Sequence, residues 1–266
     1  MIPQSIAEAV LAAERLEAFP RAAARILKVV ENPNSSILDL ERAVADDPSV
    51  SARLVKTANS PYFGMSRTIG NLRDALMMLG FRATHRLAIT MATVGRAPGP
   101  FGPTLWMDAL ATGAACRAVC RAIGGRVDED EAQLAGLLHD IGILVLLRVD
   151  PAGENRLLKE QWASGDLLAA ERARYGFDHA ELGAACLERW QFPVTLARAV
   201  ATHHVAPDAM AKAKVEPFQV VVALGAVLAR PTNRAGAREY SGLIDLGPAG
   251  LEQAVADAAL LRDAPL

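Results

Sequence analysis

The sequence predicts an all-α protein. Apolar residues recur three and four positions apart along most of the chain, as in Leu72, Ala75, Leu76 and Leu79, and this spacing places them on one face of a helix. Residue types typical of helix ends separate these runs, whereas segments that alternate polar and apolar residues between turns are missing. We therefore expect an N-terminal bundle of short helices packed on a second helical layer.

The first helices can be placed from their capping residues. Ser36 followed by Asp39 is typical of a capping box at a helix start. Asn71 is positioned to cap a helix that Gly80 ends. With the other periodic runs, these signals predict five or six short helices over residues 1–96.

One break in the helical pattern predicts a boundary. The segment GRAPGPFGP, residues 95–103, holds three prolines and three glycines, which favour a connecting loop. We predict an N-terminal subdomain over residues 1–96 and a second helical subdomain over 104–231. Residues 232–266 would form a C-terminal tail with a last helix at about 250–262.

Composition excludes several classes of protein. Of the 266 residues, 52% are hydrophobic and 22% are charged, and the net charge is -2, as in a globular protein with a large core. A charge this close to zero gives no general attraction to nucleic acid or anionic membranes. No apolar run approaches the ~20 residues that span a bilayer. We therefore expect a cytoplasmic location and no membrane partner.

The histidines are the main candidates for chemistry. The chain has five, and four of them fall between residues 139 and 204, each beside an acidic residue or another histidine. Divalent metals favour such clusters of imidazole and carboxylate groups. Buried histidines that only make hydrogen bonds with the core are the alternative, and spacing alone leaves both interpretations open.

Several motifs in a fixed order resemble one known family. They are ANSPYFG at 58–64, LG at 79–80, HDIG at 139–142 and FDHAE at 177–181. Together they resemble the HDOD family, bacterial signalling domains related to the HD phosphohydrolases, over a region from about Phe19 to about Arg230. This resemblance implies an HD-domain-like fold for the second helical layer.

The resemblance also implies a set of metal ligands. In active HD enzymes a histidine on an early helix, the His-Asp pair and a late aspartate bind one metal, and relatives with larger sites add further histidines. The matching positions of this chain give six candidate ligands, which are Asp108, His139, Asp140, His179, His203 and His204.

The chain departs from the active pattern at three points. Asp108 stands where the early histidine is expected, and the late aspartate is missing, since the nearest matches are Gly225 and Ala226. Ile143 replaces a lysine that in many HD enzymes can meet a phosphate. Losing an anionic ligand and a cation weakens metal-assisted hydrolysis. We therefore expect no catalytic residue and no cofactor, with a vestigial site for Fe, Mn, Zn or Ni as the alternative.

These observations predict a non-catalytic signal-transduction module. Its expected partners are those of the family, namely sensor kinases, response regulators or cyclic dinucleotide enzymes acting in trans. One alternative is a metal-dependent HD-type phosphohydrolase or cyclic nucleotide phosphodiesterase. Another is a sensor that binds a nucleotide without hydrolysing it.

A second region, residues 59–88, is a candidate docking surface. Its aromatic and basic residues would face an acidic protein or an anionic nucleotide; they are Tyr62, Phe63, Arg67, Arg82, His85 and Arg86. A solvated surface with two buried aromatic rings is the alternative. Nucleic acid is disfavoured, because the patch is short and the isoelectric point is about 6.2.

Overall fold

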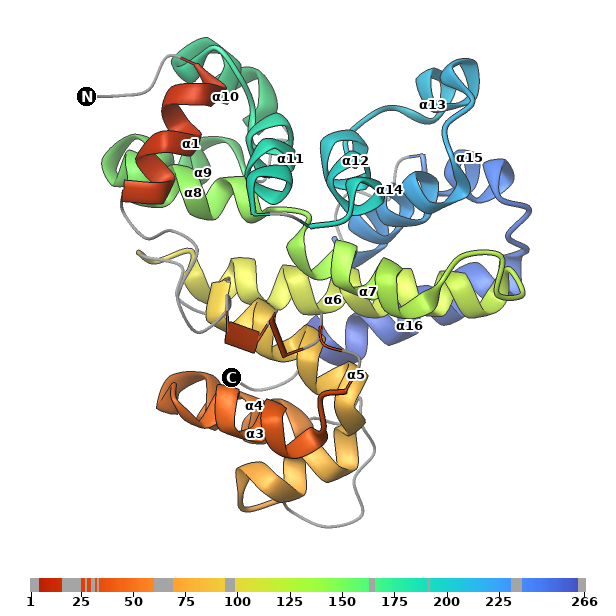
Figure 1. The fold of residues 1–266 in the computed structure, drawn as a ribbon. Coiled ribbons are helices and arrows are strands. Elements are labelled where there is room, and N and C mark those ends of the chain that lie inside the picture. Colours follow the sequence, from red (N-terminus) through yellow and green to blue (C-terminus); the bar gives the residue numbers. More distant parts are fainter. Residues whose placement is uncertain are drawn as a thin grey trace.

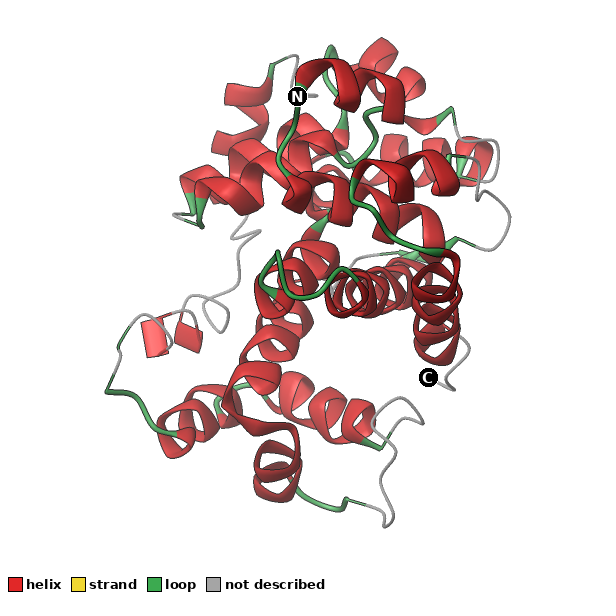
Figure 2. Cartoon of the chain, turned by 90° about the vertical axis from the view of Figure 1, so that its right-hand side faces the viewer, coloured by secondary structure: helices red, strands yellow, loops and turns green. Residues whose placement is uncertain are grey.

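A computed structural model describes residues 5–15, 25–26, 28–29, 32, 34–59, 69–93, 99–162, 166–190, 192–230 and 236–262. Over these residues the chain is helical and has no strand (Figures 1 and 2). The predicted all-α fold is confirmed.

The helices keep the labels of Figure 1. They are α1 (Ile6–Arg15), α3 (Ile37–Ala45), α4 (Pro48–Ala58), α5 (Leu72–Thr93), α6 (Gly102–Ala122), α7 (Glu129–Leu138), α8 (Ile141–Val149), α9 (Pro151–Gln161), α10 (Leu167–Tyr175), α11 (His179–Arg189), α12 (Val194–Thr202), α13 (Pro207–Ala213), α14 (Pro217–Ala229), α15 (Ala237–Leu243) and α16 (Pro248–Arg262).

Helices α3, α4 and α5 form a small bundle at one end of the molecule (Figure 1). The capping box of Ser36 and Asp39 starts α3, as predicted. The side chain of Asn71 accepts the backbone N–H of Asp74 at 2.8 Å and so caps α5. Gly80 adopts a φ of 75°, a conformation that glycine reaches without strain. The first helical segment of α5 therefore ends at Gly80, as predicted, and a second segment follows across a kink.

Helix α1 lies apart from this bundle. It packs against α8 and α11, and Figure 1 shows it beside the second layer. The first helix of the predicted N-terminal subdomain therefore contributes to the core of the other one. A subdomain boundary at residues 95–103 stays a prediction.

Helix α6 is the centre of the second layer, with α7, α14 and α16 packed along it. Small residues allow this close packing. A Cβ atom on Gly136 of α7 would lie 2.8 Å from Sγ of Cys116 in α6, and one on Gly225 of α14 would overlap the same sulfur. Because α7 and α14 both approach Cys116, these two helices also pack against each other beside α6.

One helical stretch is longer and more apolar than the sequence analysis expected. Residues 129–149, which contain α7 and α8, are long and apolar enough to cross a bilayer by length and composition. Of the most apolar window in this stretch, 83% is buried inside the protein. A core helix of a soluble protein has the same property, so the stretch is weak evidence for a membrane span.

Candidate metal centre

Five helices position one cluster of polar side chains in the second layer. Asp108 lies within α6, His139 and Asp140 lie between α7 and α8, and His179 is the first residue of α11. His203 and His204 follow α12. All six predicted ligands come together, in two overlapping groups that share Asp140.

The start of α11 holds His179 in place. Asp178 and Glu181 form a capping box, in which each side chain accepts the backbone N–H of the other residue, at 2.9 and 3.0 Å. The other constraint is Gly142 in α8. A Cβ atom there would overlap the carbonyl oxygen of His179 and would lie 2.9 Å from the nitrogen of Gly183. Glycine therefore allows α8 and α11 to touch.

The first group, here called the histidine end, contains Asp140, His179, His203 and His204. Oδ1 of Asp140 lies 3.3 Å from Nε2 of His179 and 3.4 Å from Nε2 of His203. Nε2 of His204 lies 3.0 Å from Nε2 of His179. Three imidazole nitrogens and one carboxylate oxygen therefore face a common point.

The opposite ring nitrogens show how these imidazoles are oriented. Nδ1 of His139 lies 2.8 Å from the carbonyl oxygen of Gly136, and Nδ1 of His203 lies 2.7 Å from that of Val200. Carbonyl oxygens only accept hydrogen bonds, so each Nδ1 donates. In the neutral ring, Nε2 then directs a lone pair into the cluster.

Glu171 of α10 orients His179 in the same way. Its carboxylate lies 2.8 Å from Nδ1 of His179 and accepts the backbone N–H of that residue at 2.8 Å. A carboxylate behind the outer nitrogen is typical of histidines that bind metal.

The donor set fits a divalent metal ion. Among the described residues, three buried atoms of the cluster lie at ion-pair distance from one another or from their neighbours but form no hydrogen bond, and they are Nε2 of His139, Nε2 of His203 and Oδ1 of Asp140. Buried polar atoms without partners are costly. Imidazole nitrogen with carboxylate oxygen is a suitable ligand set for Zn, Fe, Ni or Mn.

The second group, here called the carboxylate end, contains Asp108, His139 and Asp140. An arginine occupies this end. Nη2 of Arg230, the residue after α14, lies 3.3 Å from Oδ2 of Asp108 and 3.1 Å from Oδ2 of Asp140. Its guanidinium also lies over the ring of Trp162, 4.5 Å from the centroid, as in a cation–π contact.

The electrostatics divide the histidines into two pairs. Burial lowers the pKa of His139, but the carboxylates of Asp140 and Asp108 outweigh it and raise that pKa to about 9. Glu171 and Asp140 similarly outweigh burial at His179 and raise its pKa to about 10. Burial lowers the pKa of His203 and of His204. Without a metal, protons on His139 and His179 therefore supply positive charge beside Asp140.

A further layer of buried acids lies behind Glu171. The Tyr175 hydroxyl lies 3.2 Å from Oε2 of Glu154 and from Oδ2 of Asp150. Burial, followed by the charge of Glu171, raises the pKa of Glu154 to about 8. Arg174 pairs with Asp150 at 2.5 Å. Near neutral pH, Glu154 therefore holds a proton while Asp150 stays charged.

Sequence reasoning missed Arg230 and Glu171. Arg230 follows the apolar segment VVVALGAVL, and an isolated charge at the end of such a helix was the available signal. Glu171 lies eight residues before His179 with no motif around it. Gly225 and Ala226, the nearest matches to the late aspartate, are buried in α14. Ile143 is fully buried in the apolar core.

The predicted docking surface is only partly described. Tyr62, Phe63 and Arg67 lie outside the described residues, as does the side chain of Arg86. His85 is buried, with 9% of its surface exposed, because α5 packs against α7 here. The structure therefore does not place His85 on an exposed basic face.

Arg82 faces an acidic turn of the same chain. Its guanidinium pairs with Asp130 at 3.3 Å, and its side chain keeps 79% of its surface exposed. Arg82 and His85 line a shallow cavity with Asp128, Asp130 and Glu131. The charge of Arg82, which belongs to the predicted basic patch, is therefore paired with an acidic residue of α7.

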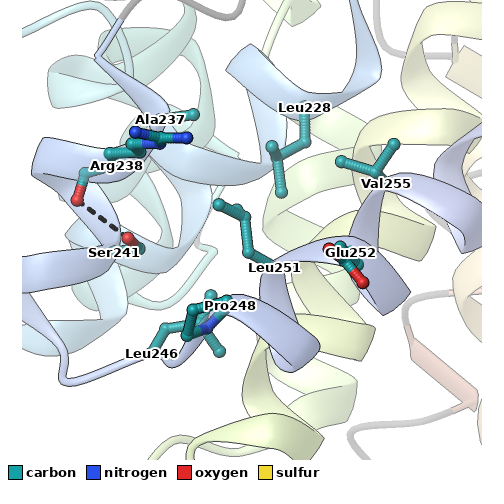
Figure 3. A pocket seen from close by; sticks show the side chains of 9 residues that line it. All are labelled: Leu228, Ala237, Arg238, Ser241, Leu246, Pro248, Leu251, Glu252 and Val255. Carbon is teal, nitrogen blue, oxygen red and sulfur yellow. Dashed lines mark hydrogen bonds between the residues drawn. The ribbon is translucent and has the colours of Figure 1, made fainter.

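A separate cavity of about 650 Å³ lies between α14, α15 and α16 (Figure 3). Its walls include Leu228, Leu251 and Val255, and the Ser241 hydroxyl donates to the carbonyl oxygen of Arg238. Helix α15 was not predicted, whereas α16 confirms the expected last helix. This cavity lacks the convergent titratable groups of the buried cluster.

Comparisons with solved structures show which proteins share this fold. The structure is similar to that of a presumed phosphohydrolase from Shewanella amazonensis SB2B, with a TM-score of 0.72, 23% identity and 96% of each chain covered. It is also similar to an HDOD domain protein of unknown function from Geobacter sulfurreducens, with a TM-score of 0.63, 21% identity and coverage of 96% of this chain and 89% of the other. At these identities the likeness shows the fold alone.

Sequence comparison identifies the family. An uncharacterised protein of Treponema pallidum is 25% identical over 205 residues, and the match spans 74% of this chain but only 40% of that protein. The sequence profile of the HDOD domain matches residues 16–206, well over half of the chain. With its helical fold and its cluster of histidine and aspartate side chains, this chain belongs to the HDOD domain family.

Proposed function

We propose that this chain is a non-catalytic regulatory module of bacterial signal transduction that acts in the cytoplasm. One observation carries the proposal, namely that Arg230 contacts the carboxylates of both Asp108 and Asp140. Its partners would be signalling proteins in trans, such as a sensor kinase, a response regulator or a cyclic dinucleotide enzyme.

The contact argues against hydrolysis on chemical grounds. An HD hydrolase relies on metal ions that polarise a phosphoryl oxygen and lower the pKa of bound water. A guanidinium stays protonated and donates hydrogen bonds, but it cannot coordinate a water molecule as a metal ion does. With Arg230 at the carboxylate end, the two aspartates of that end already have a cationic partner. The chain also lacks the lysine and the late aspartate of active HD enzymes, and this too argues against hydrolysis.

The histidine end supports one alternative function. Asp140, His179, His203 and His204 would hold a single divalent ion, and a bound ion would supply Lewis acidity for phosphodiester hydrolysis. Glu171 would keep His179 oriented toward that ion, and the buried atoms without partners favour this possibility. The alternative is thus a metal-dependent phosphodiesterase with one ion.

A hydrolysis assay separates the two functions. The protein would be purified without chelators and incubated with Mn²⁺ or Zn²⁺ and two substrates, bis-p-nitrophenyl phosphate and a cyclic dinucleotide. We expect no turnover above that of the Asp140→Ala variant. Turnover that requires metal and disappears in both Asp140→Ala and His203→Ala would overturn the proposal in favour of the phosphodiesterase.

A further inference from the structure

We propose that Arg230 is a built-in cation that takes the place of a metal ion at the carboxylate end, and that removing it opens a site for one additional divalent ion. The inference rests on the arrangement behind the proposed function, but it concerns ion binding and not hydrolysis.

The first argument is the convergence of two buried carboxylates. Asp108 and Asp140 expose only 9% and 8% of their surfaces. Their Oδ2 atoms lie 3.3 and 3.1 Å from a single atom, Nη2 of Arg230. Two buried carboxylates this close are stabilised by a cation or by a shared proton. Here the chain supplies that cation covalently.

The second argument is the ligand set that would remain without the guanidinium. Oxygens of Asp108 and Asp140 and Nε2 of His139 all lie within 4.8 Å of one another. Nε2 of His139 lies 3.1 Å from Asp140 Oδ2 and 3.5 Å from Asp108 Oδ2. Nδ1 of His139 is already bonded to Gly136. Two carboxylates and one oriented imidazole are three ligands suited to a divalent ion.

The third argument is that Arg230 is held where it is. Trp162, at the end of α9, contacts one face of the guanidinium. Arg230 is also the capping residue after α14, so its backbone is tied to the helix that packs on α6. The cation is therefore fixed by packing on two elements.

The histidine end shares Asp140 with this exchange but uses the other oxygen of that carboxylate. Arg230 contacts Asp108, Asp140 and Trp162, whereas His179, His203 and His204 face the other oxygen of Asp140 or each other. The effect of removing Arg230 is thus an increase of one ion per chain, whether the unaltered protein binds no ion or one.

The test is a count of bound metal. The unaltered chain, Arg230→Gln and Arg230→Lys would be stripped with chelator, equilibrated with Zn²⁺ or Mn²⁺, desalted and analysed by inductively coupled plasma mass spectrometry. We expect Arg230→Gln to bind one ion more than the unaltered chain. Arg230→Lys, which keeps the positive charge, should match the unaltered chain. Adding Asp108→Asn to Arg230→Gln should abolish the gain.

Thermal unfolding gives a second readout. Without metal, Arg230→Gln should melt at a lower temperature than the unaltered chain, and Zn²⁺ should reverse most of that loss. Equal metal counts for Arg230→Gln and the unaltered chain would overturn the proposal. So would a variant that stays unfolded with or without Zn²⁺, since a metal would then be unable to replace the guanidinium. Hydrolysis by the unaltered chain would overturn only the proposed function.

Discussion

The two ends of the buried cluster share Asp140 but satisfy it differently. At the histidine end, Nε2 atoms of His179 and His203 face one carboxylate oxygen, and only a proton or an added ion can join them. At the carboxylate end, Arg230 supplies positive charge from within the chain. Under the proposal made above, the comparison teaches that a metal site would degenerate unevenly, with one end keeping its ligands while the other acquires a substitute for the ion.

The largest expected effect comes from removing the residue that both ends share. Asp140→Ala leaves the partly buried charge of Arg230 and the buried charge of protonated His139 without their common partner. Breaking a buried ion pair costs about 3–5 kcal/mol. We expect a loss of that size in the free energy of unfolding, measured by urea titration. Asp208→Ala, which removes an exposed carboxylate, is the control, and equal losses in both variants would contradict the shared role.

The next effect tests the acids behind the histidine end. The pKa of Glu154 rises from 4.5 to about 8 in the folded protein, so the folded chain holds a proton that the unfolded chain releases. Glu154 therefore lowers stability as the pH rises from about 4.5 to 8. Glu154→Gln should remove this loss and stabilise the protein at pH 8 by on the order of a few kcal/mol, with less difference at pH 5.

Glu160 offers a control for that measurement. It lies on the same helix and is exposed, so Glu160→Gln should leave the pH dependence of the unfolding free energy unchanged. Identical pH profiles for Glu154→Gln and the unaltered chain would show that Glu154 is ionised in the folded protein at neutral pH.

A smaller effect would distinguish the two ends. Glu171→Gln weakens the hydrogen bond that orients His179 without reaching Arg230. Loss of such a partner costs roughly 10–100-fold in metal affinity. We expect weaker Zn²⁺ binding at the histidine end by that factor, measured in competition with a chromophoric chelator. Glu188→Gln on the exposed side of α11 is the control, and unchanged affinity in Glu171→Gln would remove His179 from the ligand set.

The smallest expected effect comes from the exposed guanidinium of Arg82, in contrast to the partly buried guanidinium of Arg230. Arg82 pairs with Asp130 between α5 and α7, but 79% of its side chain is exposed. Exposed ion pairs contribute about 0–1 kcal/mol. Arg82→Ala should therefore change the unfolding free energy by less than about 1 kcal/mol, measured by urea titration as above. A larger loss would mean that this pair is needed to hold the bundle on α7.

The sequence predicted the helical fold and the six candidate ligands because both depend on local patterns. Periodic apolar residues and capping pairs determine where helices begin, as at Ser36. His139-Asp140 and the FDHAE segment carry family motifs that place side chains at helix ends. Short motifs along the chain were therefore sufficient to predict most of the candidate ligands.

What the sequence did not predict depends on contacts between distant segments. Arg230 reaches Asp108 across 122 positions of the chain, because α14 packs along α6 and ends beside it. Helix α14 has no acidic residue, and the isolated charge at its end did not indicate which side chains Arg230 would contact. His85 fits a basic face by helical spacing, yet the packing of α5 on α7 buries it.

The contact between Gly142 and His179 has a consequence for mutational surveys of such clusters. Gly142 carries no group that could bind an ion, yet any side chain there would collide with the His179 backbone and displace its imidazole. A scan that scores each position by lost ion binding would rank this glycine with the histidines. Sensitivity to substitution thus reports steric crowding as well as ligand chemistry. Ligands must therefore be assigned by replacing one donor atom with another, and not from loss of ion binding alone.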